Sequence, residues 1–239
     1  MEKMVSVIIP TLNERGSLPT LFEEWKEPAK KLLTKNIRVE LLIIDDNSSD
    51  GTAEYVESTV AEMPFALRLI KRSERGLATA VLRGITEANG DWLIIMDADG
   101  SHPPALIPKM VHALANDVDI VLPSRYMPGG GSEDWTWNRK FISRIATGLA
   151  RIVGIKASDP MSGFFGLQRK VIDTVHLSPI GYKILLEILV KGRYRTSQEI
   201  AYTFRNRVRG QSKMSRKIIV QYLRHLWKLW WWKHTKKEA

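Results

Sequence analysis

The stretch Asp91-Trp92-Leu93-Ile94-Ile95-Met96-Asp97-Ala98-Asp99 decides how this chain folds and where its chemistry lies. Its apolar middle predicts a buried strand, and two carboxylates one residue apart follow at the strand's end. Residues i and i+2 of a strand point to the same side, so Asp97 and Asp99 can face one point. Two anions held so close repel unless a cation lies between them, and paired carboxylates suit Mg²⁺ or Mn²⁺. For Asp-x-Asp by itself, two solvated turn residues are the alternative.

The sequence on both sides of this stretch alternates between strand and helix patterns. Strands are predicted at 5–9, 39–44, 67–70, 92–96 and 119–122, and helices at about 17–33, from 52, at 76–88 and from 103. This alternation is typical of βαβ units, and apolar strands without polar alternation fit a sheet covered on both faces. We therefore predict an α/β, Rossmann-like fold with a mainly parallel central sheet and helices on both faces.

Polar residues end three of the predicted strands, and ligands of such sheets bind outside the carboxyl ends of the strands. The three groups are Thr11-Asn13-Glu14, Asp45-Asp46-Asn47 and Asp97-Asp99. Three such groups at one sheet edge favour a functional site over turn chemistry alone.

The composition is that of an ordinary globular protein, with 239 residues, 44% hydrophobic and 26% charged. The chain has no cysteine, which excludes disulfides and thiolate metal sites. The first residues lack the apolar region of a signal peptide, and no run reaches the roughly 18 apolar residues of a membrane span.

The net charge of +10 is concentrated at the carboxyl end, where eleven Lys and Arg residues and one acid, Glu238, lie from Arg205 onward. Helical spacing over 217–233 places Ile219, Leu223 and Trp230 on one side and basic residues on another. Tryptophan with basic residues on an amphipathic helix suits an anionic membrane surface. The alternative is a helix packed on the catalytic domain with its aromatic residues in the core. We expect a catalytic domain at 1–215 and a basic, Trp-rich amphipathic tail at 216–239.

Two further segments complete the pattern. Residues 129–131 are three glycines, which suit either a lid or a plain surface loop. Residues 141–153 predict an amphipathic helix whose apolar side carries Phe141, Ile145 and Leu149.

Seven motifs together resemble the inverting GT-A glycosyltransferases of family 2. Within that family the chain most resembles the synthases of polyprenyl-phosphate sugars, above all those of dolichyl-phosphate mannose. The motifs span residues 5 to about 215 in the family's order: Ile9-Pro10-Thr11-Leu12-Asn13-Glu14, Ile44-Asp45-Asp46-Asn47-Ser48-Ser49-Asp50-Gly51-Thr52, Arg75-Gly76-Leu77-Ala78-Thr79-Ala80, Asp97-Ala98-Asp99-Gly100-Ser101-His102-Pro103, Ser124-Arg125-Tyr126, Ser162-Gly163-Phe164 and Arg207-Val208-Arg209-Gly210-Gln211-Ser212-Lys213. The last block is the narrowest and points to the polyprenyl-phosphate branch.

The resemblance implies a role for each matching position. The nucleoside would be held by Pro10, Leu12, Glu14, Ile44 and Asp46. The diphosphate would be held by Asp97, Ala98 and Asp99 through Mg²⁺ or Mn²⁺, with Ser101 near a metal position where relatives often carry the longer Gln. The donor or acceptor phosphates would contact Arg125, Arg207 and Lys213, and the lipid phosphate Arg139 and Ser143.

The resemblance also implies the reaction: a hexose, with mannose from GDP-mannose as the expected case, passes to a polyprenyl or dolichyl phosphate and becomes β-linked. Another sugar nucleotide such as UDP-glucose, or a saccharide acceptor, remains open. A saccharide acceptor needs a base carboxylate, often followed by a Gln-x-x-Arg-Trp block, which this sequence lacks. Only the basic tail would support a nucleic-acid partner, so we do not expect one.

We expect a peripheral enzyme on the cytosolic face of a membrane. Many relatives continue into transmembrane helices. Three alternatives therefore stay open here: a peripheral protein, one that recruits a separate membrane subunit, and a shortened piece of a longer chain.

Overall fold

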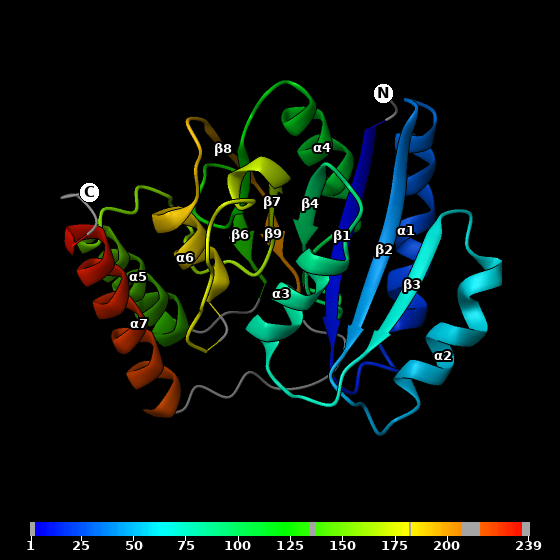
Figure 1. Cartoon of the computed structure of the whole chain (residues 1–239), viewed down its shortest axis with the longest axis horizontal. Helices are drawn as coiled ribbons and strands as arrows, with labels where there is room; N and C mark the ends of the chain where they lie inside the picture. Colours follow the sequence, from blue (N-terminus) through cyan, green and yellow to red (C-terminus); the bar gives the residue numbers. More distant parts are fainter. Residues whose placement is uncertain (1–2, 134–136, 182, 207–215, 236–239) are drawn as a thin grey trace.

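The computed structural model describes residues 3–133, 137–181, 183–206 and 216–235 (Figure 1). A seven-stranded sheet forms its centre, in the order β3-β2-β1-β4-β7-β5-β8. The strands are β1 (Lys3–Thr11), β2 (Ile37–Asp45), β3 (Ala66–Lys71), β4 (Trp92–Ile95), β5 (Ile120–Ser124), β7 (Phe165–Gln168) and β8 (Ser197–Ala201). β7 runs antiparallel to β4 and β5, whereas the other neighbours pair in parallel, so the predicted mainly parallel sheet is confirmed.

Helices cover both faces of this sheet, as predicted (Figure 1). They are α1 (Leu18–Leu33), α2 (Thr52–Thr59), α3 (Leu77–Glu87), α4 (Ile107–Ala115), α5 (Trp137–Ile152), α6 (Ile184–Lys191) and α7 (Arg216–Thr235). Short 3₁₀ turns lie at Val60–Glu62, Pro104–Leu106 and Arg169–Val171, and β6 (Gly131–Ser132) pairs with β9 (Thr203–Phe204) beside the main sheet.

The strand residues alternate between two separate cores. Val7 and Ile43 pack with α1, α2 and α4, while Ile8 and Ile44 pack with α3, α5, α6 and α7. Successive side chains of a strand point to opposite faces, so a strand that is apolar throughout feeds both cores. The uninterrupted apolar strands therefore follow from burial on two sides.

Helix α5 forms where the sequence predicts a helix, but much of its apolar stripe stays outside the core. Phe141, Ile145 and Ile152 are 50%, 49% and 71% exposed, whereas Thr147 and Ala150 are buried. Helix α7 lies alongside α5 (Figure 1), and the hydroxyl of Tyr222 donates to the carbonyl oxygen of Ala146 at 2.6 Å. The stripe is thus only partly covered by its neighbour.

Helix α7 has one buried and one exposed side. Leu226 and Leu229 belong to the core shared with α6, whereas Trp227 and Trp231 are 69% and 55% exposed. Among the described helices, none combines the length and apolar character needed to cross a bilayer.

Candidate functional site

The polar ends of β1, β2 and β4 meet at one edge of the sheet. Thr11 lies opposite Asp45 in the β1–β2 register, and the backbone N–H of Asp46 donates to the carbonyl oxygen of Thr11 at 3.0 Å. On the other side of β1, the N–H of Met96 donates to the carbonyl oxygen of Ile8 at 3.2 Å, which places Asp97 next to the end of β1. The edge predicted from the sequence is therefore formed.

The two carboxylates after β4 have different surroundings. Asp99 is 5% exposed, and its Oδ1 accepts the N–H of Ser101 at 3.0 Å. The side chain of Asp97 is 29% exposed and faces Gly163, where an added Cβ would lie 3.3 Å from Asp97 Oδ2. Gly163 precedes the antiparallel strand β7, so a side chain at this position would crowd the Asp97 carboxylate.

The hydroxyl of Ser101 supports a ligand at this position. Ser101 is fully buried, and its Oγ finds no hydrogen-bond partner among the described residues. Buried polar atoms normally have partners, so an orphaned oxygen two residues from Asp99 fits a metal ion or its bound water. The described residues contain no cluster of three or more His, Asp or Glu side chains able to hold a metal. Mg²⁺ is usually bound by one or two carboxylates together with substrate phosphates, and Asp97 and Asp99 would fit that arrangement.

His102 fixes the backbone of Asp97, a role that the sequence did not reveal. Its Nδ1 accepts the N–H of Asp97 at 3.0 Å, and its ring stacks on Phe164 with centroids 5.0 Å apart. Complete burial lowers the pKa of His102, against the opposing effect of Asp97 and Asp99. The imidazole is therefore neutral at pH 7, as an accepting Nδ1 requires.

Side-chain hydrogen bonds join the loops after β1 and β2. Asp45 accepts from the N–H and hydroxyl of Ser48, and Asn13 Oδ1 accepts the N–H of Ser49 at 2.9 Å. Asn13 and Asn47 adopt left-handed φ values of 59° and 60°, a conformation that asparagine tolerates better than most residues. These hydrogen bonds join the two loops into a rim at the edge of the sheet.

The residues expected to hold the nucleoside differ in how exposed their side chains are. Leu12 is 43% exposed at this rim, and Glu14 beside it is half-buried. Pro10 and Ile44 are buried at the ends of β1 and β2, and the Ile44 side chain packs in the core beneath α3. Only the backbone of Ile44 can therefore face a ligand in this arrangement.

Asp46 organises the loop before α3. Its carboxylate accepts from Arg72 Nη1 at 2.5 Å and from the N–H of Gly76 at 2.7 Å. The Arg72 guanidinium also donates to Thr79 Oγ1 at 2.8 Å. Both Asp46 and Arg72 are nearly buried, so the acidic residue predicted to face the nucleoside also fixes the Arg72–Gly76 loop.

Arg125 follows β5 at the same edge and is held by a buried partner. Its Nε and Nη2 donate to the two oxygens of Asp159 at 2.6 Å and 2.7 Å. This bidentate pair raises the pKa of Arg125 despite the opposing effect of burial, so the guanidinium stays charged. The structure thus adds Asp159 to the residues found from sequence.

Of the residues expected to bind the acceptor phosphate, Ser143 is described in full. It is half-buried on α5, and its Oγ accepts the hydroxyl of Tyr126 at 2.7 Å, which connects α5 to the turn after Arg125. Arg139 lies on α5, but its side chain is outside the described residues, as are Arg207 and Lys213.

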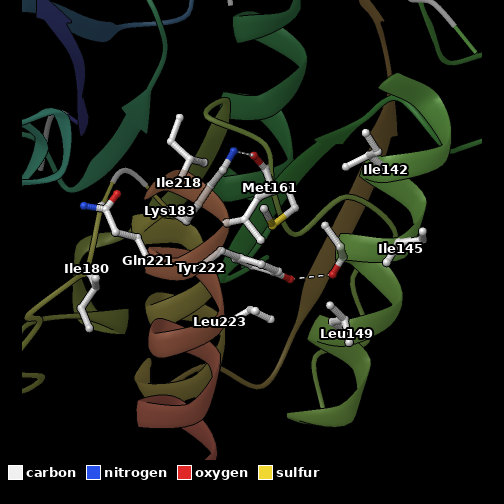
Figure 2. Close-up of a pocket in the computed structure, with 13 residues that line it drawn as sticks. Ile142, Ile145, Leu149, Met161, Ile180, Lys183, Ile218, Gln221, Tyr222 and Leu223 are labelled. Atoms are coloured by element: carbon white, nitrogen blue, oxygen red, sulfur yellow. Dashed lines mark hydrogen bonds between the residues drawn. The ribbon is translucent and has the colours of Figure 1, made fainter. Parts of the chain in front are cut away.

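Two pockets lie beside α5. An apolar groove of about 160 Å³ separates α5 from α7 (Figure 2), with walls that include Ile142, Leu149 and Leu223. At its upper end in this view, Lys183 Nζ donates to the carbonyl oxygen of Met161 at 2.8 Å.

A polar cavity of about 590 Å³ lies on another side of α5. It is lined by Arg125, Tyr126, Met127, Gly130, Arg144, Thr147, Gly148, Arg151 and Ser158.

The chain is similar in sequence to known glycosyltransferases. A family model described as "Glycosyl transferase family 2" matches residues 6–175. A dolichol-phosphate mannosyltransferase of Pyrococcus furiosus is 44% identical over 95% of this chain, which spans 64% of that relative, just under two thirds of its length. The dolichol-phosphate mannosyltransferase of Saccharomyces cerevisiae is 40% identical over 94% of this chain and 86% of its own length.

Solved structures confirm the fold. A glucosyl-3-phosphoglycerate synthase of Mycobacterium tuberculosis, in complex with Mn²⁺, UDP-glucose and phosphoglyceric acid, superposes with a TM-score of 0.66. It is 17% identical, over 94% of this chain and 80% of its own. A mannosyltransferase of Pyrobaculum calidifontis, in complex with GDP-Man and Mn²⁺, has a TM-score of 0.61 at 20% identity, over 95% of this chain and 62% of its own.

The predicted GT-A fold is thereby confirmed. With a family model over residues 6–175 and relatives of 40–44% identity over nearly its whole length, the protein belongs to glycosyl transferase family 2.

Proposed function

We propose that this protein transfers mannose from GDP-mannose to the phosphate of a polyprenyl phosphate such as dolichyl phosphate, with inversion at the anomeric carbon. The observation that carries the proposal is the apolar groove between α5 and α7, which lies against the helix that bears Ser143. An acceptor with a hydrocarbon chain and a phosphate head needs both an apolar wall and polar groups at one end. The names of the two sequence relatives support the same reaction.

The groove and the sheet edge lie on one continuous path. Ile142 lines the groove, its neighbour Ser143 receives the Tyr126 hydroxyl, and Tyr126 follows Arg125 at the end of β5. A lipid chain lying along Ile142 would present its phosphate toward Ser143, with Arg139 on the same helix. Arginine suits this contact because a guanidinium binds phosphate in bidentate fashion.

The acceptor needs to be positioned, and it needs no base. A phosphate monoester is already largely anionic near neutral pH, whereas a sugar hydroxyl must lose a proton to a positioned base. Attack on the face opposite the leaving diphosphate inverts the centre, so an α-linked donor gives a β-linked product. The residues around the acceptor therefore orient it and exclude water.

The donor would lie across the carboxyl ends of β1, β2 and β4. Leu12, Glu14 and the Asp46–Arg72 loop would meet the nucleoside, and Asp97 and Asp99 would hold Mg²⁺ or Mn²⁺ against the diphosphate. When bound, that cation would offset the charge that develops on the departing diphosphate. His102 keeps Asp97 in place, and Arg207 and Lys213 are assigned to the donor or acceptor phosphates.

The exposed apolar side chains of α5 and α7 support a location of the enzyme at a membrane surface. Trp227 and Trp231 on α7 and Phe141 on α5 are each at least half exposed. Tryptophan is enriched where hydrocarbon meets water, and basic residues nearby favour an anionic leaflet. We assign residues 1–215 to catalysis and 216–239 to the interface, on the cytosolic side where sugar nucleotides are available.

A panel of radiolabelled sugar nucleotides tests the proposal. Each donor is incubated with the protein, a short polyprenyl phosphate and Mg²⁺ or Mn²⁺, and the lipid fraction is counted. We expect label from GDP-mannose, loss of that label with a chelator, and its return when the metal is restored. Label from UDP-glucose only, or transfer only to saccharides, would overturn the choice of donor or acceptor.

A further inference from the structure

The polar cavity beside α5 carries an excess of positive charge. Among the described residues that line it are Arg125, Arg144 and Arg151 and no carboxylate, and the nearby Glu199 carboxylate accepts the N–H of the lining residue Ser158 at 2.7 Å. Asp159 balances the charge of Arg125, but in the part of the chain that the structure describes the side chains of Arg144 and Arg151 form no ion pair or hydrogen bond. Two uncompensated guanidinium groups at one cavity favour an anionic ligand, and phosphate matches their geometry best.

The cavity adjoins the exposed apolar stripe of α5. Arg144 and Arg151 are exposed, and each directly precedes an exposed isoleucine, Ile145 or Ile152. The two arginines are seven residues apart, so they lie about 10 Å apart along the same side of the helix. The two arginines and the two isoleucines therefore form neighbouring stripes about 100° apart around α5. Such neighbouring stripes suit a helix lying in a bilayer interface, where apolar groups enter the acyl region and arginines reach lipid phosphates.

From this juxtaposition we propose that Arg144 and Arg151 at this cavity bind the phosphate group of an anionic membrane phospholipid. Arg125, which also lines the cavity, stays paired with Asp159 and is left to the substrate phosphates, and the polyprenyl chain lies in the α5–α7 groove. The inference rests on the proposed action at a membrane and adds a second lipid site to it. Ser158 contributes a hydroxyl to the cavity wall, and Gly148 leaves its middle open, since an added Cβ there would meet no atom within 4 Å. The exposed side chains of Ile145 and Ile152 next to the arginines favour a lipid over a soluble phosphate ester as the source of the anion.

Vesicle binding tests the site directly. The protein and the double variant Arg144→Gln/Arg151→Gln are sedimented with vesicles of phosphatidylcholine alone or with phosphatidylglycerol added. We expect the double variant to lose on the order of 25-fold in binding to the anionic vesicles, about five-fold for each arginine, and little with phosphatidylcholine. The double variant Lys30→Gln/Lys31→Gln removes the same charge from the exposed side of α1 and should change binding much less.

A second variant separates a shaped cavity from a simple charge effect. Gly148→Gln adds a neutral side chain into the cavity, and Gly148→Ala is its control for helix integrity. We expect Gly148→Gln to lower binding to anionic vesicles several-fold and Gly148→Ala to leave it unchanged. Unchanged binding by Gly148→Gln, together with equal losses in the Arg and Lys double variants, would overturn the proposal.

Two further measurements separate a failure of the phospholipid site from a failure of the proposed sugar transfer. In detergent micelles without phospholipid, Arg144→Gln/Arg151→Gln should transfer sugar to a short polyprenyl phosphate as well as the unmodified protein. A large loss there would mean that the cavity serves the acceptor, and tight calorimetric binding of inorganic phosphate would mean a soluble ligand; either result overturns the phospholipid site. If the unmodified protein transfers no sugar in micelles, the proposed function fails. The vesicle result still decides whether the cavity binds an anionic phospholipid.

Discussion

Arg125 and Asp159 form two parallel hydrogen bonds between buried groups that lie 34 residues apart in the sequence. The pair joins the end of β5 to the segment that leads into β7, and the same segment carries Gly163 opposite Asp97. The position of the Arg125 cation and the close approach of Gly163 to the Asp97 carboxylate are therefore fixed by one connection.

Replacement of Asp159 by Asn should destabilise the protein strongly. The guanidinium of Arg125 would remain buried without its counter-charge, which typically costs about 3–5 kcal/mol of unfolding free energy. Urea unfolding followed by circular dichroism measures the loss. The double variant Arg125→Met/Asp159→Leu should recover much of the stability but not the transferase activity, and full activity in that double variant would exclude a role for Arg125 in binding phosphate.

Asp97→Asn and Asp99→Asn should each weaken Mn²⁺ binding and lower sugar transfer at least about 100-fold, because a metal ion contributes several kcal/mol to stabilising the leaving group. Electron paramagnetic resonance of Mn²⁺ with and without nucleoside diphosphate gives the affinity. Asp91→Asn, at the exposed start of the same stretch, is the matched control and should change neither quantity. Full activity of Asp99→Asn in the presence of chelator would contradict the metal site.

Ser101→Ala tests the orphaned hydroxyl. If Ser101 Oγ contacts a bound metal ion through water, its loss should weaken metal binding about ten-fold, as for other groups that support metal ligands. If it contacts nothing, removing a buried unsatisfied oxygen should leave affinity unchanged and raise the unfolding free energy by about 1–3 kcal/mol. Titration with Mn²⁺ and thermal unfolding of the same variant tell the two outcomes apart.

His225 should make stability depend on pH through the packing of α7 on α6. Burial lowers the pKa of His225 from its usual 6.5, Lys228 and Lys191 lower it further, and Glu187 opposes them. Below pH 6.5 the unfolded chain binds this proton and the folded chain does not. The unfolding free energy should therefore fall as the pH decreases from about 6.5 to the lower folded pKa, by at most about 1.4 kcal/mol per pH unit. His225→Leu should remove this part of the slope in urea titrations at several pH values, and an unchanged slope would contradict it.

Trp227→Ala should lower partitioning to phosphatidylcholine vesicles, which carry no net charge. Trp227 is 69% exposed, so its removal leaves the core intact but withdraws a large apolar side chain from the interface, worth about 1.5–3 kcal/mol if it is fully buried in lipid. Tryptophan fluorescence during vesicle titration measures the change. Trp25→Ala would be a poor control because Trp25 lies in the core, whereas Leu33→Ala removes an exposed apolar side chain on α1 and should have no effect.

The sequence predicted the fold class and the edge of the sheet where the site lies, because both depend on local patterns. The apolar run before Asp97 is typical of a strand buried on both faces, and parallel βαβ units bring the ends of their strands together. The motif order placed Asp46, Asp97 and Arg125 at that edge, where the structure also has them.

What the sequence could not decide depends on contacts between distant segments. The short apolar run at Phe164 gave no sign that β7 would insert antiparallel between β4 and β5, and nothing local marked Asp159 as the partner of Arg125 or His102 as the acceptor for the Asp97 N–H. Helical periodicity predicted α5 and its apolar stripe, but only the placement of α7 decided that Ile145 and Ile152 stay exposed. Periodicity records which side chains share a face, whereas what covers that face depends on the packing of the whole chain.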